Sequence, residues 1–251
     1  MKRLIAPFIC MVIFTGCFAT SNQTPQLPSA GTEGTTIATH DPANPPIDCP
    51  LRKQGINPQD MKPFSDTQKY IDFLERTDRA KWQMPETIIN ELHLSGAETI
   101  ADVGAGSGYF SFRFAHVLPN GKVFAIDIEP EMLRHIYHKA VAGGVGNIEV
   151  IKADFDDPHV PSGVDIVFVC DVIHHVKERG MWLRKLSSEM KKGAKLVVVE
   201  FKEGDLPEGP PARLKISKNK LIAMIAETNF KLDLDKPKLL PYQVFLVFSK
   251  T

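Results

Sequence analysis

Residues 99–115 carry the feature that most constrains the fold of this chain. A short apolar stretch, a glycine-rich turn and an amphipathic segment follow one another there without interruption. Ile100–Val103 predicts a buried strand, and the apolar residues after the turn recur at helical spacing. The turn contains Gly104, Gly106 and Gly108. Because glycine has no side chain, the backbone can turn sharply and approach a ligand there. The pattern predicts a strand–loop–helix unit that receives a ligand at its turn.

The spacing of these glycines separates two classes of cofactor. A dinucleotide-binding loop carries the pattern Gly-x-Gly-x-x-Gly. Here Tyr109 stands where the last of those glycines belongs, and Gly108 comes one residue earlier. With Asp102 in front, the loop reads Asp-x-Gly-x-Gly-x-Gly, and an acid, Asp127, ends the next apolar run. This arrangement resembles the first motif of class I S-adenosylmethionine-dependent methyltransferases. The resemblance implies S-adenosylmethionine as the cofactor, and an NAD-dependent Rossmann oxidoreductase is the alternative.

Charge and cysteine content argue against other classes of function. The 251 residues include 30 basic and 30 acidic side chains, so no net field would attract a nucleic acid. The sequence has no run of Lys or Arg with aromatic residues between them. The four cysteines, at positions 10, 17, 49 and 170, lack the spacing of metal ligands. We therefore predict no nucleic-acid partner and no metal site.

The N-terminus has the layout of an export signal. A basic head at residues 1–3 precedes an apolar run at 4–14, and Thr-Gly-Cys17 follows with small residues. Residues 1–16 therefore predict a secretory signal peptide, too short to span a bilayer permanently. The end of this segment resembles a bacterial lipobox, although Phe14 replaces the usual aliphatic residue, and this implies lipidation of Cys17. The predicted location is the bacterial cell envelope, lipid-anchored at the periplasmic face or the surface. The alternatives for the segment are a plain signal peptide or an uncleaved anchor. If the segment is not a signal, the predicted location is the cytoplasm.

Composition divides the rest of the chain into a tether and one domain. Residues 17–60 are rich in Thr, Ser, Pro, Gly and Asn and have few large apolar side chains. Such a segment cannot bury enough surface to offset its ordering entropy, so a flexible tether is predicted. Residues 61–251 predict a single domain, whose first part, 61–95, predicts an N-terminal helical lid.

Helix and strand patterns alternate through this domain. Repeated βα units require a parallel sheet with right-handed crossovers. The fold class predicted is α/β, a Rossmann-like seven-stranded mostly parallel sheet with an antiparallel last strand and helices on both faces. The family resemblance implies that the last strand lies between the fifth and the sixth. The predicted helices are 66–79, one from Pro85, 107–117, 130–142, 178–191 and 217–227, and the predicted strands are 98–103, 122–127, 147–151, 164–170, 194–201, 230–234 and 242–248.

The glycine loop begins the predicted cofactor site, because ligands of open α/β sheets bind outside the carboxyl ends of the strands. The family resemblance implies that the loop backbone packs against the amino-acid and ribose parts of S-adenosylmethionine. It also implies that Asp102 lies near the ammonium group of the cofactor, directly or through water. The loop residues assigned to the cofactor are Gly104, Ala105, Gly106 and Gly108.

Residues after the next two strands complete the predicted cofactor site. Asp127 should accept hydrogen bonds from both ribose hydroxyls, because a carboxylate can take two donors; a helix cap before Pro130 is the alternative role. Ile128 can cover the adenine face. The resemblance implies that Asp154 and Phe155 also recognise the adenine, with solvated acids in a turn as the alternative.

The segment after the fourth predicted sheet strand is the predicted reacting end of the site. Asp171 is expected to touch the methionine end of the cofactor, and His174 and His175 are the catalytic candidates. A histidine that titrates near neutrality can remove a proton from an O–H or N–H nucleophile. The alternatives are structural histidines, or methyl transfer by alignment of the reactants without a base. Glu200 and Trp82 are further candidates for lining this region, and Trp82 is equally compatible with core packing.

Two functions from different classes follow. The favoured function is an S-adenosylmethionine-dependent methyltransferase that acts on a small-molecule acceptor. The alternative is a non-catalytic module on a lipoprotein that binds S-adenosylmethionine or another nucleoside. It is kept because S-adenosylmethionine is made in the cytoplasm, whereas the N-terminus predicts export.

Overall fold

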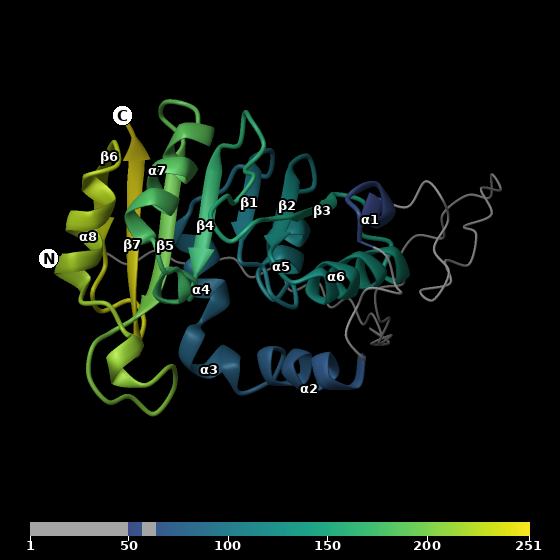
Figure 1. Cartoon of the computed structure of the whole chain (residues 1–251), viewed down its shortest axis with the longest axis horizontal. Coiled ribbons are helices and arrows are strands. Elements are labelled where there is room, and N and C mark those ends of the chain that lie inside the picture. The colour runs from purple at the N-terminus through teal and green to yellow at the C-terminus, as the bar shows by residue number, and fades with distance from the viewer. Residues whose placement is uncertain (1–49, 57–63) are drawn as a thin grey trace, which may run out of the picture. The chain divides into compact units, whose positions relative to one another are not determined.

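The computed structural model describes residues 50–56 and 64–251. The predicted signal peptide at 1–16, Cys17 and most of the predicted tether lie outside the described residues. Within the described chain, seven strands form one sheet in the order β3-β2-β1-β4-β5-β7-β6 (Figure 1). The strands are β1 (Thr99–Val103), β2 (Lys122–Asp127), β3 (Ile148–Lys152), β4 (Ile166–Cys170), β5 (Lys195–Phe201), β6 (Phe230–Asp235) and β7 (Gln243–Lys250).

The direction of the strands confirms the predicted topology. β1 pairs in parallel with both β2 and β4, and further parallel pairs join β2 to β3 and β4 to β5. β7 lies between β5 and β6 and is antiparallel to both. The strand order reverses at β1 and β4, so the carboxyl ends of these two strands form the position where open α/β sheets bind ligands.

Unbroken apolar strands explain why the sheet carries helices on both faces. Val167–Val169 in β4 and Leu196–Val199 in β5 are fully buried, as expected for parallel strands covered on both sides. α4, α5 and α6 contribute to the core on one face, and α7 and α8 contribute to the core on the other. These helices are α4 (Pro85–Glu91), α5 (Ser111–Val117), α6 (Pro130–Ala142), α7 (Arg179–Glu189) and α8 (Lys218–Ala226).

The predicted lid at 61–95 contains three helices where two were predicted, because the predicted helix 66–79 is interrupted. α2 (Phe64–Leu74) and α3 (Arg79–Gln83) are separated by a turn within the predicted helix 66–79. Glu75 in this turn bonds to Lys139 of α6 at 2.6 Å, and Arg76 bonds to Glu208 at 2.5 Å. Because these partners are distant in sequence, the apolar periodicity of residues 66–79 could not predict the turn between the two helices. Both helices lie near the end of the sheet at which β4 has its carboxyl end (Figure 1).

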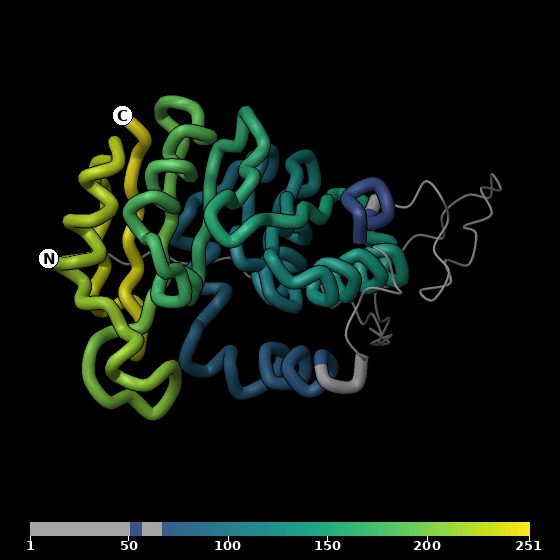
Figure 2. The backbone as a smooth tube through the Cα atoms, viewed as in Figure 1, coloured from purple at the N-terminus to yellow at the C-terminus, as the bar shows by residue number. Residues whose placement is uncertain are grey.

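Part of the predicted tether is folded. α1 (Pro50–Lys53) lies beside the β3 edge of the sheet (Figure 2). Leu51 and Ile56 are buried in a cluster with residues of β2, β3 and α6. The Gln54 side chain donates to the Val150 carbonyl and accepts from the Lys152 amide, both at 2.7 Å. The prediction of a flexible tether does not hold for residues 50–56, which contact the sheet through two apolar side chains and one side-chain amide.

No helix in the described part of the chain combines the length and the apolar character needed to cross a membrane.

Candidate functional site

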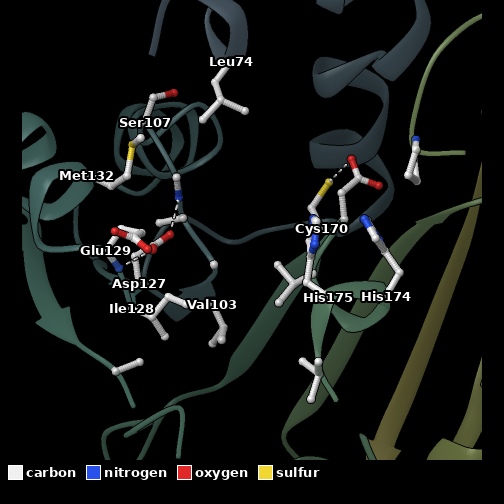
Figure 3. Close-up of a pocket in the computed structure, with 18 of the residues that line it drawn as sticks. Leu74, Val103, Ser107, Asp127, Ile128, Glu129, Met132, Cys170, His174 and His175 are labelled. Carbon is white, nitrogen blue, oxygen red and sulfur yellow. Dashed lines mark hydrogen bonds between the residues drawn. The ribbon is translucent and has the colours of Figure 1, made fainter. Parts of the chain in front are cut away.

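A cavity of about 1510 Å³ lies at the carboxyl ends of the parallel strands. Its lining comes from the loops after β1, β2, β3 and β4, from the lid, and from the segment after β5. Figure 3 shows the glycine loop and Asp127 on one side of this space and the two histidines on the other. Single-ligand pockets are typically about 300–1,000 Å³, so this cavity has room for more than one small molecule.

The glycine loop has a conformation and a packing that require glycine. Gly104 has φ +76°, and a Cβ on it would lie 2.2 Å from a methyl carbon of Val172. Gly104 and Ala105 donate their amides to the Ile126 carbonyl at 2.8 and 3.0 Å, which holds the loop against β2. Gly104, Ala105, Gly106 and Ser107 all line the cavity. The buried Ser107 hydroxyl has no hydrogen-bond partner among the described residues.

Asp127 lies at the end of β2 with its carboxylate fixed by the backbone. Oδ2 accepts from the Gly106 amide at 2.8 Å, and Oδ1 accepts from the Glu129 amide at 2.9 Å. Burial raises the pKa of this carboxyl, and the two backbone hydrogen bonds oppose that rise. Each oxygen keeps capacity for a further donor, and Asp127 lines the cavity.

The predicted adenine-contacting residues also lie along this end of the cavity. Ile128, Asp154 and Phe155 all line it. Phe155 is 84% exposed, so one large apolar side chain here is left to be covered by a ligand. Asp154 is engaged by His159, whose Nε2 lies 2.8 Å from its Oδ2.

Two of the predicted cofactor residues do not line the cavity. Gly108 packs against Ile136 and Phe112 behind the loop, where a Cβ would lie 3.0 Å from each. Asp102 is 3% exposed and accepts the Ser111 hydroxyl at 2.6 Å. Burial raises the pKa of Asp102 to about 7, against the effect of that hydrogen bond. The structure thus places Asp102 behind the loop, and contact of Asp102 with the ammonium group stays a prediction.

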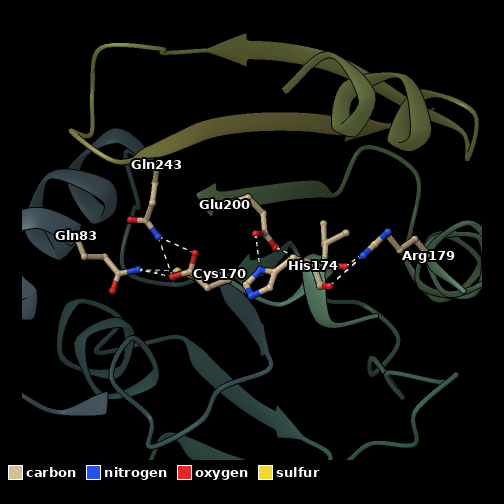
Figure 4. A network of polar contacts seen from close by, with 8 residues as sticks. Gln83, Cys170, His174, Arg179, Glu200 and Gln243 are labelled. Carbon is tan, nitrogen blue, oxygen red and sulfur yellow. Dashed lines mark hydrogen bonds and ion pairs between the residues drawn. The ribbon is translucent and has the colours of Figure 1, made fainter. Parts of the chain in front are cut away.

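Asp171 lines the cavity at the end of β4 and is held by two glutamines (Figure 4). Gln83 of α3 donates to its Oδ2 at 3.0 Å, and Gln243 of β7 donates to both oxygens at 2.8 Å. Asp171 has φ +60°, a conformation uncommon for a residue with a side chain. Burial and the charge of Glu200 raise its pKa to about 7, while the Gln243 hydrogen bond opposes them.

His174 and Glu200 form a buried pair beside this carboxylate. His174 Nδ1 lies 2.8 Å from Glu200 Oε2, and both side chains are less than 5% exposed. Burial opposes protonation of His174, but the hydrogen bond and the charge of Glu200 outweigh it and hold the pKa above its usual value. Nδ1 therefore carries the proton that Glu200 accepts, which leaves Nε2 on the far side of the ring as the basic nitrogen. Arg179 donates to the carbonyls of Ile173 and His174 and fixes the turn that carries the ring.

His175 differs from its neighbour in environment. It also lines the cavity, but it is exposed and its ring centroid lies 4.1 Å from that of His174. Burial of part of the ring and the charge of His174 lower the pKa of His175. Among the residues that the structure describes, no carboxylate orients His175 in the way that Glu200 orients His174. Of the two predicted catalytic candidates, the structure thus gives only His174 the arrangement of an oriented base.

The sequence did not predict Gln83, Gln243 or the pairing of Glu200 with His174. Gln83 and Gln243 are separated from Asp171 by 88 and 72 residues. A glutamine carries no sequence signal that reports such a partner. The position of His174 and His175 directly after the fourth predicted sheet strand indicated a functional segment, but only the position of β5 beside β4 shows which histidine meets Glu200.

A group of possible metal ligands lies outside the cavity's reacting end. Among the described residues, Asp157, His159 and Glu189 have ligand atoms within 4.8 Å of one another. Lys185 Nζ lies 3.0 Å from Asp157 Oδ2 and 3.4 Å from Glu189 Oε1. The lysine ammonium thus already compensates these carboxylates, and we assign no metal to this group.

Comparison with known proteins gives relatives for the whole βα region. A family model described as "Methyltransferase domain" matches residues 94–242. The ubiquinone/menaquinone biosynthesis C-methyltransferase UbiE of Syntrophotalea carbinolica is 29% identical over 157 residues, 59% of this chain and 64% of that protein. The (S)-coclaurine N-methyltransferase of Thalictrum flavum is 25% identical over 48% of this chain and 34% of its own length. The chain thus spans less than two thirds of the length of these relatives.

Solved structures show the same fold. A SAM dependent methyltransferase from Aquifex aeolicus superimposes with a TM-score of 0.67 and 24% identity, over 73% of this chain and 98% of that one. PigF with SAH gives a TM-score of 0.59 and 16% identity, over 75% and 60%. The fold class and the resemblance to class I S-adenosylmethionine-dependent methyltransferases are both confirmed. Since the family model covers more than half of the chain, this protein belongs to the methyltransferase-domain family.

Proposed function

We propose that this protein is an S-adenosylmethionine-dependent methyltransferase that acts on a small-molecule acceptor. One observation carries the proposal: a single cavity joins the glycine loop and Asp127 to the oriented base His174. The volume of the cavity, about 1510 Å³, supports the presence of a cofactor and an acceptor together. The equal numbers of basic and acidic side chains support a small molecule rather than a nucleic acid.

The residues at the loop end of the cavity fit the cofactor. Asp127 is oriented by two backbone amides and would accept the ribose hydroxyls. The backbone of the glycine loop, which lines the cavity, would pack against the amino-acid part. Ile128 and the exposed Phe155 would cover the adenine, with Asp154 at its edge. Asp171 would lie toward the methionine end.

The residues at the other end fit removal of a proton from the acceptor. When bound, S-adenosylmethionine supplies a methyl group on a positively charged sulfur; the methyl–sulfur bond breaks as the bond to the acceptor oxygen or nitrogen forms, and S-adenosylhomocysteine leaves. His174 Nε2 would take the proton that the acceptor loses. Glu200 would stabilise the resulting imidazolium, because its carboxylate already accepts the Nδ1 proton. The proton then passes to solvent when the product leaves.

Replacing Asp127 with Ala tests the cofactor assignment. Affinity for S-adenosylhomocysteine should fall by about 1.5–3 kcal/mol, the scale of hydrogen bonds to a charged group. The measurement is isothermal titration calorimetry on the wild-type and Asp127→Ala proteins. Asp233→Ala, which removes an exposed carboxylate of β6 far along the sheet, is the matched control. Equal affinities of all three proteins for S-adenosylhomocysteine would contradict the cofactor role and favour the alternative role of Asp127 as a helix cap.

We also propose that the protein is exported and anchored by a lipid on Cys17. The basic head, the short apolar run and Thr-Gly-Cys17 support this location in the bacterial cell envelope. Mass spectrometry of the protein purified from a bacterial membrane fraction should find acylated Cys17 as the first residue. An intact Met1 on protein recovered from the cytoplasm would contradict the proposal.

A further inference from the structure

We propose that the acceptor is a flat aromatic ring that carries a hydroxyl group, and that it stacks on an aromatic wall of the cavity. This inference rests on the proposed methyltransferase function and names the class of its acceptor. We define the aromatic wall as Phe73, Arg76, Trp82 and Phe201, all of which line the cavity. These residues come from α2, the turn after it, α3 and the end of β5.

The members of the wall contact one another in a continuous row. The Arg76 guanidinium carbon lies 4.4 Å from the Phe73 ring centroid and 5.6 Å from that of Trp82. The Trp82 and Phe201 centroids are 5.6 Å apart, with ring planes inclined by 37°. Phe201 is 6% exposed and supports Trp82 from behind, so Phe73 and Trp82 are the rings that can stack on a flat ligand. An aliphatic chain would gain only apolar contact there.

The wall is held in place from both sides. Arg76 bonds to Glu208 at 2.5 Å, which ties the lid to the segment after β5. In the same segment, a Cβ on Gly209 would lie 2.5 Å from the Phe201 ring, so the backbone there rests directly on that ring. Such close contact fixes the ring orientation before a ligand arrives, which reduces the ordering cost of binding.

The chemistry around the wall favours an uncharged acceptor body. Both cavity arginines already have partners: Arg76 bonds to Glu208, and Arg79 bonds to Gln83 and to the Leu74 carbonyl. Phe73 is 56% exposed, and Met181 on the far side of the lining is 53% exposed. Large apolar side chains left in solvent at a cavity mark a surface that an apolar ligand covers.

The base determines which nucleophile this ring can carry. Glu200 orients His174 as a base, and an aromatic hydroxyl gives up its proton to such a base more readily than an aliphatic alcohol does, because it is the stronger acid. An aromatic hydroxyl also lies in the plane of its ring, which lets the ring stack while the oxygen faces the base. The wall and the base together point to an aromatic alcohol.

Two probes with the same carbon skeleton test this assignment. 2-Naphthol is a flat aromatic alcohol, and decahydro-2-naphthol is its saturated, puckered counterpart. Each is titrated calorimetrically into the full chain saturated with S-adenosylhomocysteine. We expect 2-naphthol to bind about tenfold more tightly than decahydro-2-naphthol, on the scale of one or two aromatic pairs. Trp82→Leu and Phe201→Leu should each remove most of this preference, while Trp82→Phe should keep it. Tyr137→Leu, an aromatic residue of α6 outside the cavity lining, is the matched control.

The outcomes separate this inference from the proposed function. Preference for 2-naphthol that depends on Trp82 and Phe201, with unchanged affinity for S-adenosylhomocysteine, supports the inference. Tight S-adenosylhomocysteine binding without a preference between the probes, or a preference unaffected by Trp82→Leu, overturns the inference and leaves the proposed function standing. Absence of S-adenosylhomocysteine binding to the wild-type protein overturns both.

Discussion

At the scale of single residues, the buried pair His174–Glu200 has the arrangement that the proposed chemistry requires. Two histidines adjacent in sequence have opposite pKa shifts. Glu200 raises the pKa of His174, whereas burial and the positive charge that His174 gains on protonation lower the pKa of His175. We therefore propose a division of roles in which His174 is the base and His175 lines the cavity. The difference arises from the position of β5, which carries Glu200.

Replacing Glu200 with Gln should lower the pKa of His174. The amide keeps the shape of the side chain and removes the negative charge that favours the imidazolium. Histidine ring signals followed by NMR against pH report the value directly. His174→Gln identifies the signal, and His159, whose partner is Asp154, serves as the internal control. An unchanged His174 pKa in Glu200→Gln would contradict the assigned pairing.

The same pair makes stability depend on pH with a defined sign. The folded-state pKa of His174 is raised, so the stabilisation by Glu200 is present below about pH 6.5, the unfolded value. It is lost as pH rises through the higher folded value. In urea unfolding, the difference in free energy of unfolding between the wild-type and Glu200→Gln proteins should therefore become smaller as the pH rises through the folded-state pKa of His174. A difference that grows with pH would contradict the assignment.

At the scale of elements, the segment 50–56 acts as a cap on the edge of the sheet. β3 is an edge strand, and its Val150 carbonyl and Lys152 amide both bond to the Gln54 side chain. One side chain thus takes the place of a neighbouring strand over part of β3. Sequence composition could not show this, because the anchoring depends on Leu51 and Ile56 within a polar stretch.

Gln54→Ala should lower the free energy of unfolding by about 1–2 kcal/mol, the net value of two hydrogen bonds. Lys53→Ala, at the exposed neighbouring position of the same segment, should leave it nearly unchanged. Urea unfolding followed by circular dichroism measures both. Equal stabilities of the two variants would show that the apolar contacts alone attach the segment.

Elements with strong periodicity were predicted from the sequence, and those that depend on distant partners were not. α6 and β2 match their predicted bounds, because Pro130 begins the helix and an apolar run defines the strand. α5 begins at Ser111, later than its predicted start, because the residues after the glycine loop remain in a turn. In the site, the loop and Asp127 followed from spacing, whereas the Gln83–Asp171–Gln243 contacts required the fold.

At the scale of the whole described molecule, the strand order explains why one cavity can serve two ligands. The strand order reverses between β1 and β4, and the cavity lies at the carboxyl ends of these strands. The lid and the segment after β5 enclose the cavity, and residues of separate elements line its two ends. The loop after β1 and Asp127 of β2 face one end, and the turn after β4 faces the other. Cofactor choice depends on the first end, where Gly108 precedes Tyr109.

The most direct test of this account is the choice of cofactor. S-adenosylhomocysteine and NAD are titrated separately into the wild-type protein by isothermal calorimetry under the same conditions. The account predicts saturable binding of one S-adenosylhomocysteine per chain and no detectable binding of NAD. Saturable binding of NAD without binding of S-adenosylhomocysteine would contradict it.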